Sequence, residues 1–157
     1  MLDVASNVGN LVSACTARLK RSPAPEQPVH VLVVDDDDAV RTYVERVLRD
    51  TGYKTTIARS GPEALGVAAG MDVLDLLLTD VMMPEMNGDE LARRLRQTEP
   101  RLKVLYLTGY SDYLFKEKVT LWADEAFLDK PCSVSAIRQA VSLIMTGCLD
   151  QTSERAS

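Results

Sequence analysis

The chain has 157 residues, of which 46% are hydrophobic and 26% charged, the length and composition of one globular domain with some flanking sequence. Its formal net charge of -5 argues against sequence-independent binding to nucleic-acid phosphates, because such binding needs a basic face. No apolar run is long enough to span a bilayer, and the N-terminus lacks the basic start and continuous apolar stretch of a secretory signal. We therefore predict a cytoplasmic protein with neither nucleic-acid nor membrane partners.

The two ends of the chain differ in composition from its middle. Residues 1–28 are expected to form an N-terminal arm. Three prolines at its end, between Ser22 and Pro28, predict a stiff linker. Apolar residues recur at helical spacing ahead of that linker, a pattern that fits a short amphipathic helix and equally a frayed arm. The small, polar residues 148–157 predict a disordered tail. One domain is therefore expected over residues 29–147.

Between these flanks, short β-rich runs alternate five times with longer helical segments, the pattern of a parallel sheet with crossover helices. The first, third and fourth runs are nearly continuous apolar stretches, which is typical of central strands covered on both faces. The runs that predict strands are Val29–Asp35, Lys54–Ala58, Leu74–Thr79, Lys103–Leu107 and Ala126–Leu128.

Helices are predicted between the strands, where apolar residues recur every three or four positions. The first runs from about Val40 to Gly52, which stands where a helix stop is expected, and Ser133 can cap the last. The others are Pro62–Ala69, Gly88–Gln97, the less regular Asp112–Ala123, and Ser133–Met145. Five βα units predict an α/β, flavodoxin-like, doubly wound (βα)5 sheet with strand order 2-1-3-4-5, in which ligands bind at the carboxyl ends of the central strands.

Acidic residues stand at the carboxyl ends of two of these central strands. Asp35–Asp38 follow the first strand and Asp80 ends the third, so the topology places both sets beside one crevice. Carboxylates this close repel one another unless a cation neutralises them, and Mg²⁺ prefers such oxygen ligands. We therefore expect Asp35 and Asp36 to bind a metal, whereas Asp37 and Asp38 are expected to cap the following helix.

Two further strand ends contribute groups that suit phosphoryl chemistry. A carboxylate such as Asp80 is a competent nucleophile toward phosphorus when cations offset the charge of the incoming group. The fourth strand ends in Thr108-Gly109, which offers a hydroxyl and a sterically open backbone N–H. The fifth is followed by Lys130, whose ammonium can pair with phosphoryl oxygens. Each residue alone is more often a turn former or a surface charge, but together they indicate one site.

In order and spacing, these motifs resemble those of response-regulator receiver domains of two-component signal transduction, over about Val29 to Met145. The matched pieces are Val33–Asp36, Leu78–Gly88, Leu107–Tyr110 and Leu128–Pro131. The resemblance implies a phosphoacceptor domain of a phosphorelay, in which Asp80 takes a phosphoryl group from a histidine kinase or phosphotransfer protein. It also implies that the chain is not an enzyme on other substrates and catalyses only its own phosphorylation and dephosphorylation.

The same resemblance implies a metal-ion role for four residues. Asp36, Asp80 and the backbone carbonyl of Met82 would ligate Mg²⁺, or Mn²⁺, directly. Asp35 would act through a bound water.

For the phosphoryl group, the resemblance implies contacts from three residues. Thr108 would hydrogen-bond the group and swing inward, the Gly109 backbone would lie beside it, and Lys130 would contact it from the other side. The Lys130–Pro131 peptide is expected to be cis, a conformation that is rare except before proline.

The resemblance also implies a switch. The aromatic residue of the family stands three positions before the lysine, which here is Phe127; without a hydroxyl its rotation would be driven by packing alone, and it also fits a plain core residue. Phosphorylation would bias the face formed by the fourth helix, fifth strand and fifth helix, where a downstream protein or a second copy would bind. Met82 and Tyr110 occupy positions that tune dephosphorylation, and neither side chain suits the orientation of a water, so we expect slow self-hydrolysis.

Alternatives remain open at this point. The chain can be a stand-alone receiver whose output is protein contact, since no effector domain is expected after residue 147, or a module of a hybrid histidine kinase. A haloacid-dehalogenase-type phosphatase would need an acid at Met82, and a flavodoxin-type cofactor site would place a phosphate against the acids after the first strand. The cysteines Cys15, Cys132 and Cys148 are widely spaced and are expected to be free thiols.

Overall fold

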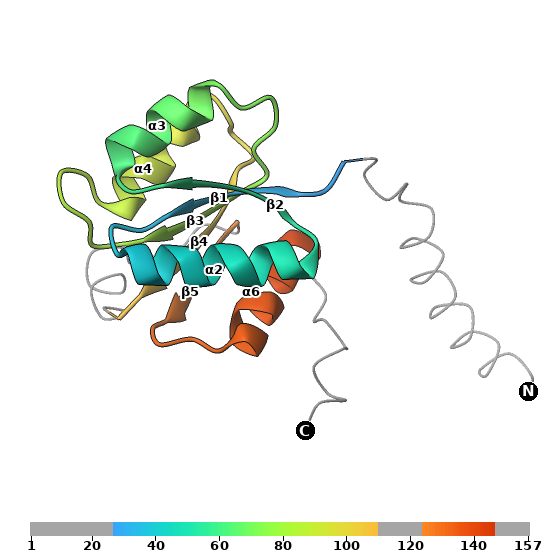
Figure 1. Cartoon of the computed structure of the whole chain (residues 1–157). Coiled ribbons are helices and arrows are strands. Elements are labelled where there is room, and N and C mark those ends of the chain that lie inside the picture. The colour runs from blue at the N-terminus through green and yellow to red at the C-terminus, as the bar shows by residue number, and fades with distance from the viewer. Residues whose placement is uncertain (1–26, 110–123, 147–157) are drawn as a thin grey trace, which may run out of the picture.

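Parallel strands form the centre of the molecule in the computed structural model, which describes residues 27–109 and 124–146 (Figure 1). In the order β2-β1-β3-β4-β5, every neighbouring pair is parallel, so the predicted strand order is confirmed. The strands of the described part are β1 His30–Val34, β2 Lys54–Ala58, β3 Leu76–Asp80, β4 Lys103–Thr108 and β5 Glu125–Asp129.

Helices connect the strands on both sides of the sheet. Those in the described residues are α2 Asp38–Thr51, α3 Gly61–Ala69, α4 Gly88–Leu95 and α6 Val134–Thr146. The predicted helix Asp112–Ala123, most of the arm 1–28 and the tail 148–157 lie outside the described residues. Within the part described, no helix has both the length and the apolar character needed to cross a membrane.

Two separate apolar clusters cover the two faces of the sheet. α3 and α4 lie on one side, where their side chains pack with residues such as Leu32, Leu77 and Tyr106 (Figure 1). On the other side, α2 and α6 pack against residues such as Val33 and Leu105. The central strands β1 and β3 are buried on both faces, as their continuous apolar sequences predict.

Capping groups define where the helices begin and end. The Asp37 side chain accepts hydrogen bonds from the backbone N–H groups of Ala39 and Val40 and caps α2, as predicted. At the other end of α2, Gly52 adopts a left-handed φ of 104°, which glycine tolerates without strain. The predicted Ser133 cap is confirmed by a 3.1 Å hydrogen bond from the Ala136 N–H to its hydroxyl.

Polar groups are also buried at the amino edge of the sheet, where the strands begin. His30, the single histidine of the chain, donates its backbone N–H to Asp75 and contacts the Thr56 hydroxyl through Nε2 at 2.7 Å. Burial and the nearby Lys54 charge lower the pKa of the His30 ring. The His30 N–H is bonded to the side chain of Asp75 and not to a backbone carbonyl of the neighbouring strand. The ladder therefore starts later, and β3 begins at Leu76 instead of the predicted Leu74.

A buried ion pair joins two further elements at the same edge. Arg96, the residue after α4, places Nη1 2.6 Å from Glu125 Oε1 at the start of β5. Its Nε and Nη2 both donate to the Leu102 carbonyl at 3.0 Å, and the Tyr106 hydroxyl donates to Glu125. Burial and the Glu125 charge raise the pKa of Tyr106. This network ties α4 to β4 and β5.

Candidate functional site

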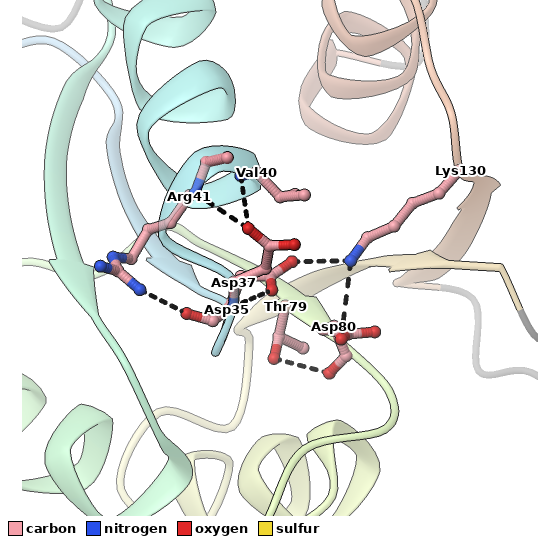
Figure 2. Close-up of polar contacts among 8 residues, drawn as sticks. Asp35, Asp37, Val40, Arg41, Thr79, Asp80 and Lys130 are labelled. Carbon is pink, nitrogen blue, oxygen red and sulfur yellow. Dashed lines mark hydrogen bonds and ion pairs between the residues drawn. The ribbon is translucent and has the colours of Figure 1, made fainter.

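Three carboxylates meet at the carboxyl edge of the sheet. Val34 of β1 pairs with Thr79 of β3, so the residues that follow, Asp35 and Asp80, emerge side by side. One carboxylate oxygen from each of Asp35, Asp36 and Asp80 lies within 4.8 Å of the others. The predicted acids therefore come together in one cluster, whereas Asp37 points its carboxylate into the helix cap (Figure 2).

Asp35 is buried and is held through three of its oxygens. Its Oδ1 accepts the backbone N–H of Asp37 at 2.9 Å, and its Oδ2 accepts the Lys130 ammonium at 2.8 Å. Its backbone carbonyl accepts Arg41 Nη1 at 2.7 Å. Figure 2 shows the two cations on opposite sides of this residue. The strand end is thereby fixed in both backbone and side chain.

Lys130 also faces the phosphoacceptor candidate. Its Nζ lies 3.5 Å from Asp80 Oδ2, and the Lys130–Pro131 peptide is cis, as predicted. Burial alone would lower the pKa of the Lys130 ammonium, but the hydrogen bond to Asp35 and the charges of Asp35 and Asp80 raise that pKa above its usual value. The side chain is therefore a permanent cation at neutral pH.

The charge on Asp80 is poorly compensated. Burial raises the pKa of its carboxyl group, and the negative charges of Asp35 and Asp36 raise it further, against the opposing effect of Lys130. A half-buried acid whose pKa is raised in this way is stabilised by any additional cation at the cluster. Oxygen ligands at this spacing are the kind that Mg²⁺ uses.

The loop after β3 sets the position of Asp80. Its backbone carbonyl accepts the Thr79 hydroxyl at 2.9 Å (Figure 2). Gly88, at the start of α4, donates its N–H to Val81 at 2.8 Å and approaches so closely that a Cβ there would stand 2.1 Å from the Asp80 carbonyl oxygen. Sequence reasoning identified Gly88 only as a turn residue, because this approach depends on how the loop folds back.

The remaining predicted site residues are placed to different degrees. Thr108 ends β4 opposite Asp129, but its side chain lies outside what the structure describes, as does all of Tyr110. Gly109 is exposed, and no atom of the described residues lies within 4 Å of where a Cβ would stand. Phe127 is half-buried and packs on the apolar cluster beneath α3 and α4, and the side chain of Met82 is exposed.

Arg41 is a site residue that sequence reasoning missed. It is buried on α2, donates to the Asp35 carbonyl and forms an ion pair with Asp38. A signal was present, since Arg41 stands at i, i+3 and i+7 with Val44 and Leu48 on the apolar stripe of the helix. A charged residue on such a stripe indicates a buried partner.

A hollow of about 290 Å³ lies beside Lys130, between α2 and the turn that leads to α6. Apolar side chains line most of it, and the Tyr43 hydroxyl donates to the Cys132 carbonyl at 3.2 Å across this junction. Its lining residues are Val40, Tyr43, Val44, Lys130, Pro131 and Cys132. Cys132 is a free thiol, as predicted.

Comparison with known proteins decides the family. The model of the response regulator receiver domain matches residues 31–142, well over half of the chain. The chain is a receiver domain of the response-regulator family. Its role in two-component signalling, predicted from the motifs, is thereby confirmed.

Curated relatives of this receiver domain include both kinases and regulators. The chain is 38% identical over 112 residues to "Sensor kinase CckA" of Brucella abortus, covering 71% of this chain and 12% of that protein. It is 47% identical over 82 residues to "Response regulator MprA" of Mycolicibacterium vanbaalenii, covering 52% of this chain and 35% of that protein. The receiver domain thus spans much less than the whole length of these relatives.

Solved structures agree with this assignment. The receiver domain from the hybrid histidine kinase CckA matches 74% of this chain and 99% of its own, with a TM-score of 0.63 and 30% identity. The Vibrio cholerae chemotaxis protein CheY4 matches 74% of this chain and 98% of its own, with a TM-score of 0.67 and 29% identity. The flavodoxin-like fold class is therefore confirmed.

Proposed function

We propose that this receiver domain accepts a phosphoryl group on Asp80 in a reaction that depends on Mg²⁺. The observation that carries the proposal is the convergence of three carboxylates and the Lys130 ammonium at the carboxyl ends of β1, β3 and β5. A carboxylate flanked by a metal site and a fixed cation has what phosphoryl transfer requires, since catalysis there consists of positioning and charge stabilisation.

The donor set fits the divalent ion that receiver domains use. Asp36, Asp80 and the Met82 carbonyl would hold Mg²⁺ or Mn²⁺ directly, and Asp35 would hold it through water. When bound, the ion neutralises charge on the phosphoryl oxygens and on the carboxylates. The raised pKa of Asp80 supports this assignment, because burial and the charges of Asp35 and Asp36 destabilise its ionised form and a bound cation would offset them.

In the proposed reaction, an Asp80 carboxylate oxygen forms a bond to phosphorus while the bond from phosphorus to the donor atom breaks. The donor atom keeps that electron pair, and the product is an aspartyl phosphate. Lys130 would turn from Asp35 and Asp80 to the phosphoryl oxygens, while the Thr108 hydroxyl and the Gly109 N–H would donate to them. Only its own phosphorylation and dephosphorylation would be catalysed by the domain.

Histidine kinases or phosphotransfer proteins are the partners of receiver domains, and we propose that one of them is the donor here. A sensor kinase among the relatives supports a hybrid-kinase setting, and the CheY4 structure, which this chain covers to 98%, supports a stand-alone setting. Downstream, Thr108 and Phe127 would bias the face around β5 and α6 together with the predicted helix 112–123. A cytoplasmic location stays a prediction from the sequence.

Intact-mass measurement tests the proposal. With Mg²⁺ and acetyl phosphate, the wild-type chain should gain the mass of one phosphoryl group, and the gain should disappear with EDTA or in Asp80→Asn. Asp72→Asn is the matched control, because Asp72 is an exposed acid near the amino edge of the sheet. A folded, Mg²⁺-binding wild type that gains no mass contradicts the proposal, as does full labelling of Asp80→Asn.

The lifetime of the phosphoryl group is a second measurable consequence. Met82 is exposed two residues after Asp80, and a thioether cannot orient an attacking water. We expect the wild-type phosphoryl group to persist for minutes or longer after the donor is removed, and Met82→Asn to shorten its lifetime. A wild-type half-life of seconds, followed by mass spectrometry, would show that another group orients the water.

A further inference from the structure

We propose that Arg41 is a positioning residue for the metal site: by holding the backbone at Asp35, it determines how tightly the acidic cluster binds Mg²⁺. The inference rests on the proposed function, since it concerns the same cluster. It adds a residue on α2 that lies behind the acids and reaches them only through the main chain.

The contacts of Arg41 point to the β1–α2 junction. Its side chain is 6% exposed, its Nη1 donates to the Asp35 carbonyl at 2.7 Å, and its Nη2 forms an ion pair with the exposed carboxylate of Asp38. That ion pair holds the pKa of Asp38 below its usual value. Both partners of Arg41 therefore belong to the segment that carries the proposed metal ligands.

Arg41 does not itself face the crevice. In Figure 2 its guanidinium and the Lys130 ammonium lie on opposite sides of Asp35, with Asp80 on the side of Lys130. Arg41 therefore cannot contact a phosphoryl group on Asp80, and its influence must pass through the residues it holds.

Asp36 is the residue that would transmit this influence. It is exposed, and its backbone is held on both sides: the preceding carbonyl, of Asp35, accepts Arg41, and the following N–H, of Asp37, donates to Asp35 Oδ1. Removal of Arg41 frees the first of these two attachments. Asp36 then has to be ordered when a metal binds, which lowers the affinity.

Comparison with Arg96 separates this role from a purely structural one. Arg96 is also a buried arginine, but its Nε and both of its terminal nitrogens donate, to Leu102 and Glu125. Arg41 leaves its Nε buried without a partner among the described residues. A buried guanidinium that is incompletely bonded contributes little to the stability of the fold. The role of Arg41 is therefore better explained by the residues that it positions.

The experiment compares Arg41→Met with Arg96→Met. Mg²⁺ affinity is measured by titration calorimetry, and the rate of phosphorylation by acetyl phosphate is measured across Mg²⁺ concentrations, both well below the melting temperatures. Arg41→Met should weaken Mg²⁺ binding about tenfold, a typical effect of losing a group that supports a ligand. Its rate at saturating Mg²⁺ should stay close to wild type. Arg96→Met should lower the melting temperature and leave Mg²⁺ affinity unchanged.

Two further variants keep the test decisive if Arg41→Met folds poorly. Arg41→Lys keeps the charge but has one nitrogen in place of the two that bond Asp35 and Asp38, so it should bind Mg²⁺ with intermediate affinity, while Asp38→Asn should have a smaller effect than Arg41→Met. Unchanged Mg²⁺ affinity in Arg41→Met, or in Arg41→Lys where only that variant folds, overturns the inference. A wild type that binds Mg²⁺ but is not phosphorylated overturns the proposed function instead, and the calorimetry still decides the role of Arg41.

Discussion

Asp80 carries a charge that the metal-free protein stabilises poorly. Its carboxylate shares the crevice with those of Asp35 and Asp36, and the nearby cation, Lys130, is already hydrogen-bonded to Asp35. Burial is the main cause of the raised pKa of Asp80, and the charges of Asp35 and Asp36 raise that pKa further, against the opposing effect of Lys130. The residue that is proposed to react is therefore also one that costs the fold stability whenever it is ionised without a counterion.

This charge predicts how stability changes with pH. A raised pKa in the folded state means that ionised Asp80 lowers the free energy of unfolding above that pKa, and that the penalty vanishes below the ordinary value of 3.8. Asp80→Asn should therefore raise the melting temperature of the metal-free protein at pH 7, by an amount that shrinks on acidification. Mg²⁺ should stabilise the wild type more than the variant.

Calorimetric melting curves at several pH values, with EDTA or Mg²⁺, measure this difference. Asp72→Asn, which removes an exposed acid far from the cluster, should behave as wild type. A metal-free Asp80→Asn that melts at or below the wild-type temperature at pH 7 would show that the ion pair with Lys130 outweighs the burial and repulsion.

The site residues at strand ends could be predicted from the sequence. The residues that hold the backbone of the acids without facing the crevice were not predicted. Asp35, Asp36, Asp80 and Lys130 end or follow recognisable strands, so topology alone brings them together. The place of Arg41 on an apolar stripe signals a buried partner without identifying it, and the close approach of Gly88 depends on loop geometry, which a linear pattern does not contain. Thr108 and Tyr110 stay predictions, because their side chains lie outside the described residues.

The connection from β3 to α4 controls where the Asp80 carboxylate points. α4 begins at Gly88, whose missing side chain allows the helix start to lie directly against the Asp80 carbonyl. Neither the Asp80 carbonyl nor the start of α4 can move easily. The Thr79 hydroxyl donates to that carbonyl, and the Gly88 N–H donates to the carbonyl of Val81. The requirement for glycine is therefore steric and not a matter of φ.

A methyl group at this position should disturb both stability and chemistry. We expect Gly88→Ala to lower the free energy of unfolding by about 1–3 kcal/mol, as overpacking does, and to slow phosphorylation by displacing Asp80. Gly66→Ala is the matched control, because Gly66 lies in α3 with open space around it and alanine favours helices by roughly 0.5–1 kcal/mol. Urea unfolding and the acetyl phosphate assay measure the two effects; a Gly88→Ala protein as stable and reactive as wild type would contradict the steric reading.

Element boundaries show what local patterns can and cannot establish. Gly52, Asp37 and Ser133 mark helix ends by capping chemistry that acts within a few residues, and all three expectations are confirmed. The Arg96–Glu125 pair joins positions 29 residues apart in sequence, and no local sequence pattern predicts it. Such long-range pairing of polar residues is the part of the fold that could not be predicted from the sequence alone.

At the scale of the whole molecule, the described residues contain both apolar layers and the acidic cluster. In the part of the chain that the structure describes, the two layers are formed by residues between Val29 and Met145. The domain of residues 29–147, with residues 1–28 as arm and linker and 148–157 as tail, stays a prediction, because the arm and tail lie almost wholly outside the described residues.

Trimming the chain tests this division. A protein of residues 27–147 should melt within a few degrees of the full chain and should retain the proposed Mg²⁺-dependent phosphorylation, because it contains both apolar layers and the acidic cluster that the structure describes. Calorimetry and the mass assay on both proteins provide the comparison. A large drop in melting temperature would show that the arm or the tail packs on the domain and contributes to its stability.

The position of the single histidine limits how this domain can receive phosphate. His30 begins β1 and Asp35 follows its end, so the two are separated by about 16 Å of extended strand, and the His30 ring is buried against Thr56. No histidine within these 157 residues can therefore hand a phosphoryl group to Asp80. A histidyl donor for the proposed reaction must come from outside them, so the rate of that transfer should follow the donor's concentration or, where a linker joins the two, its effective concentration.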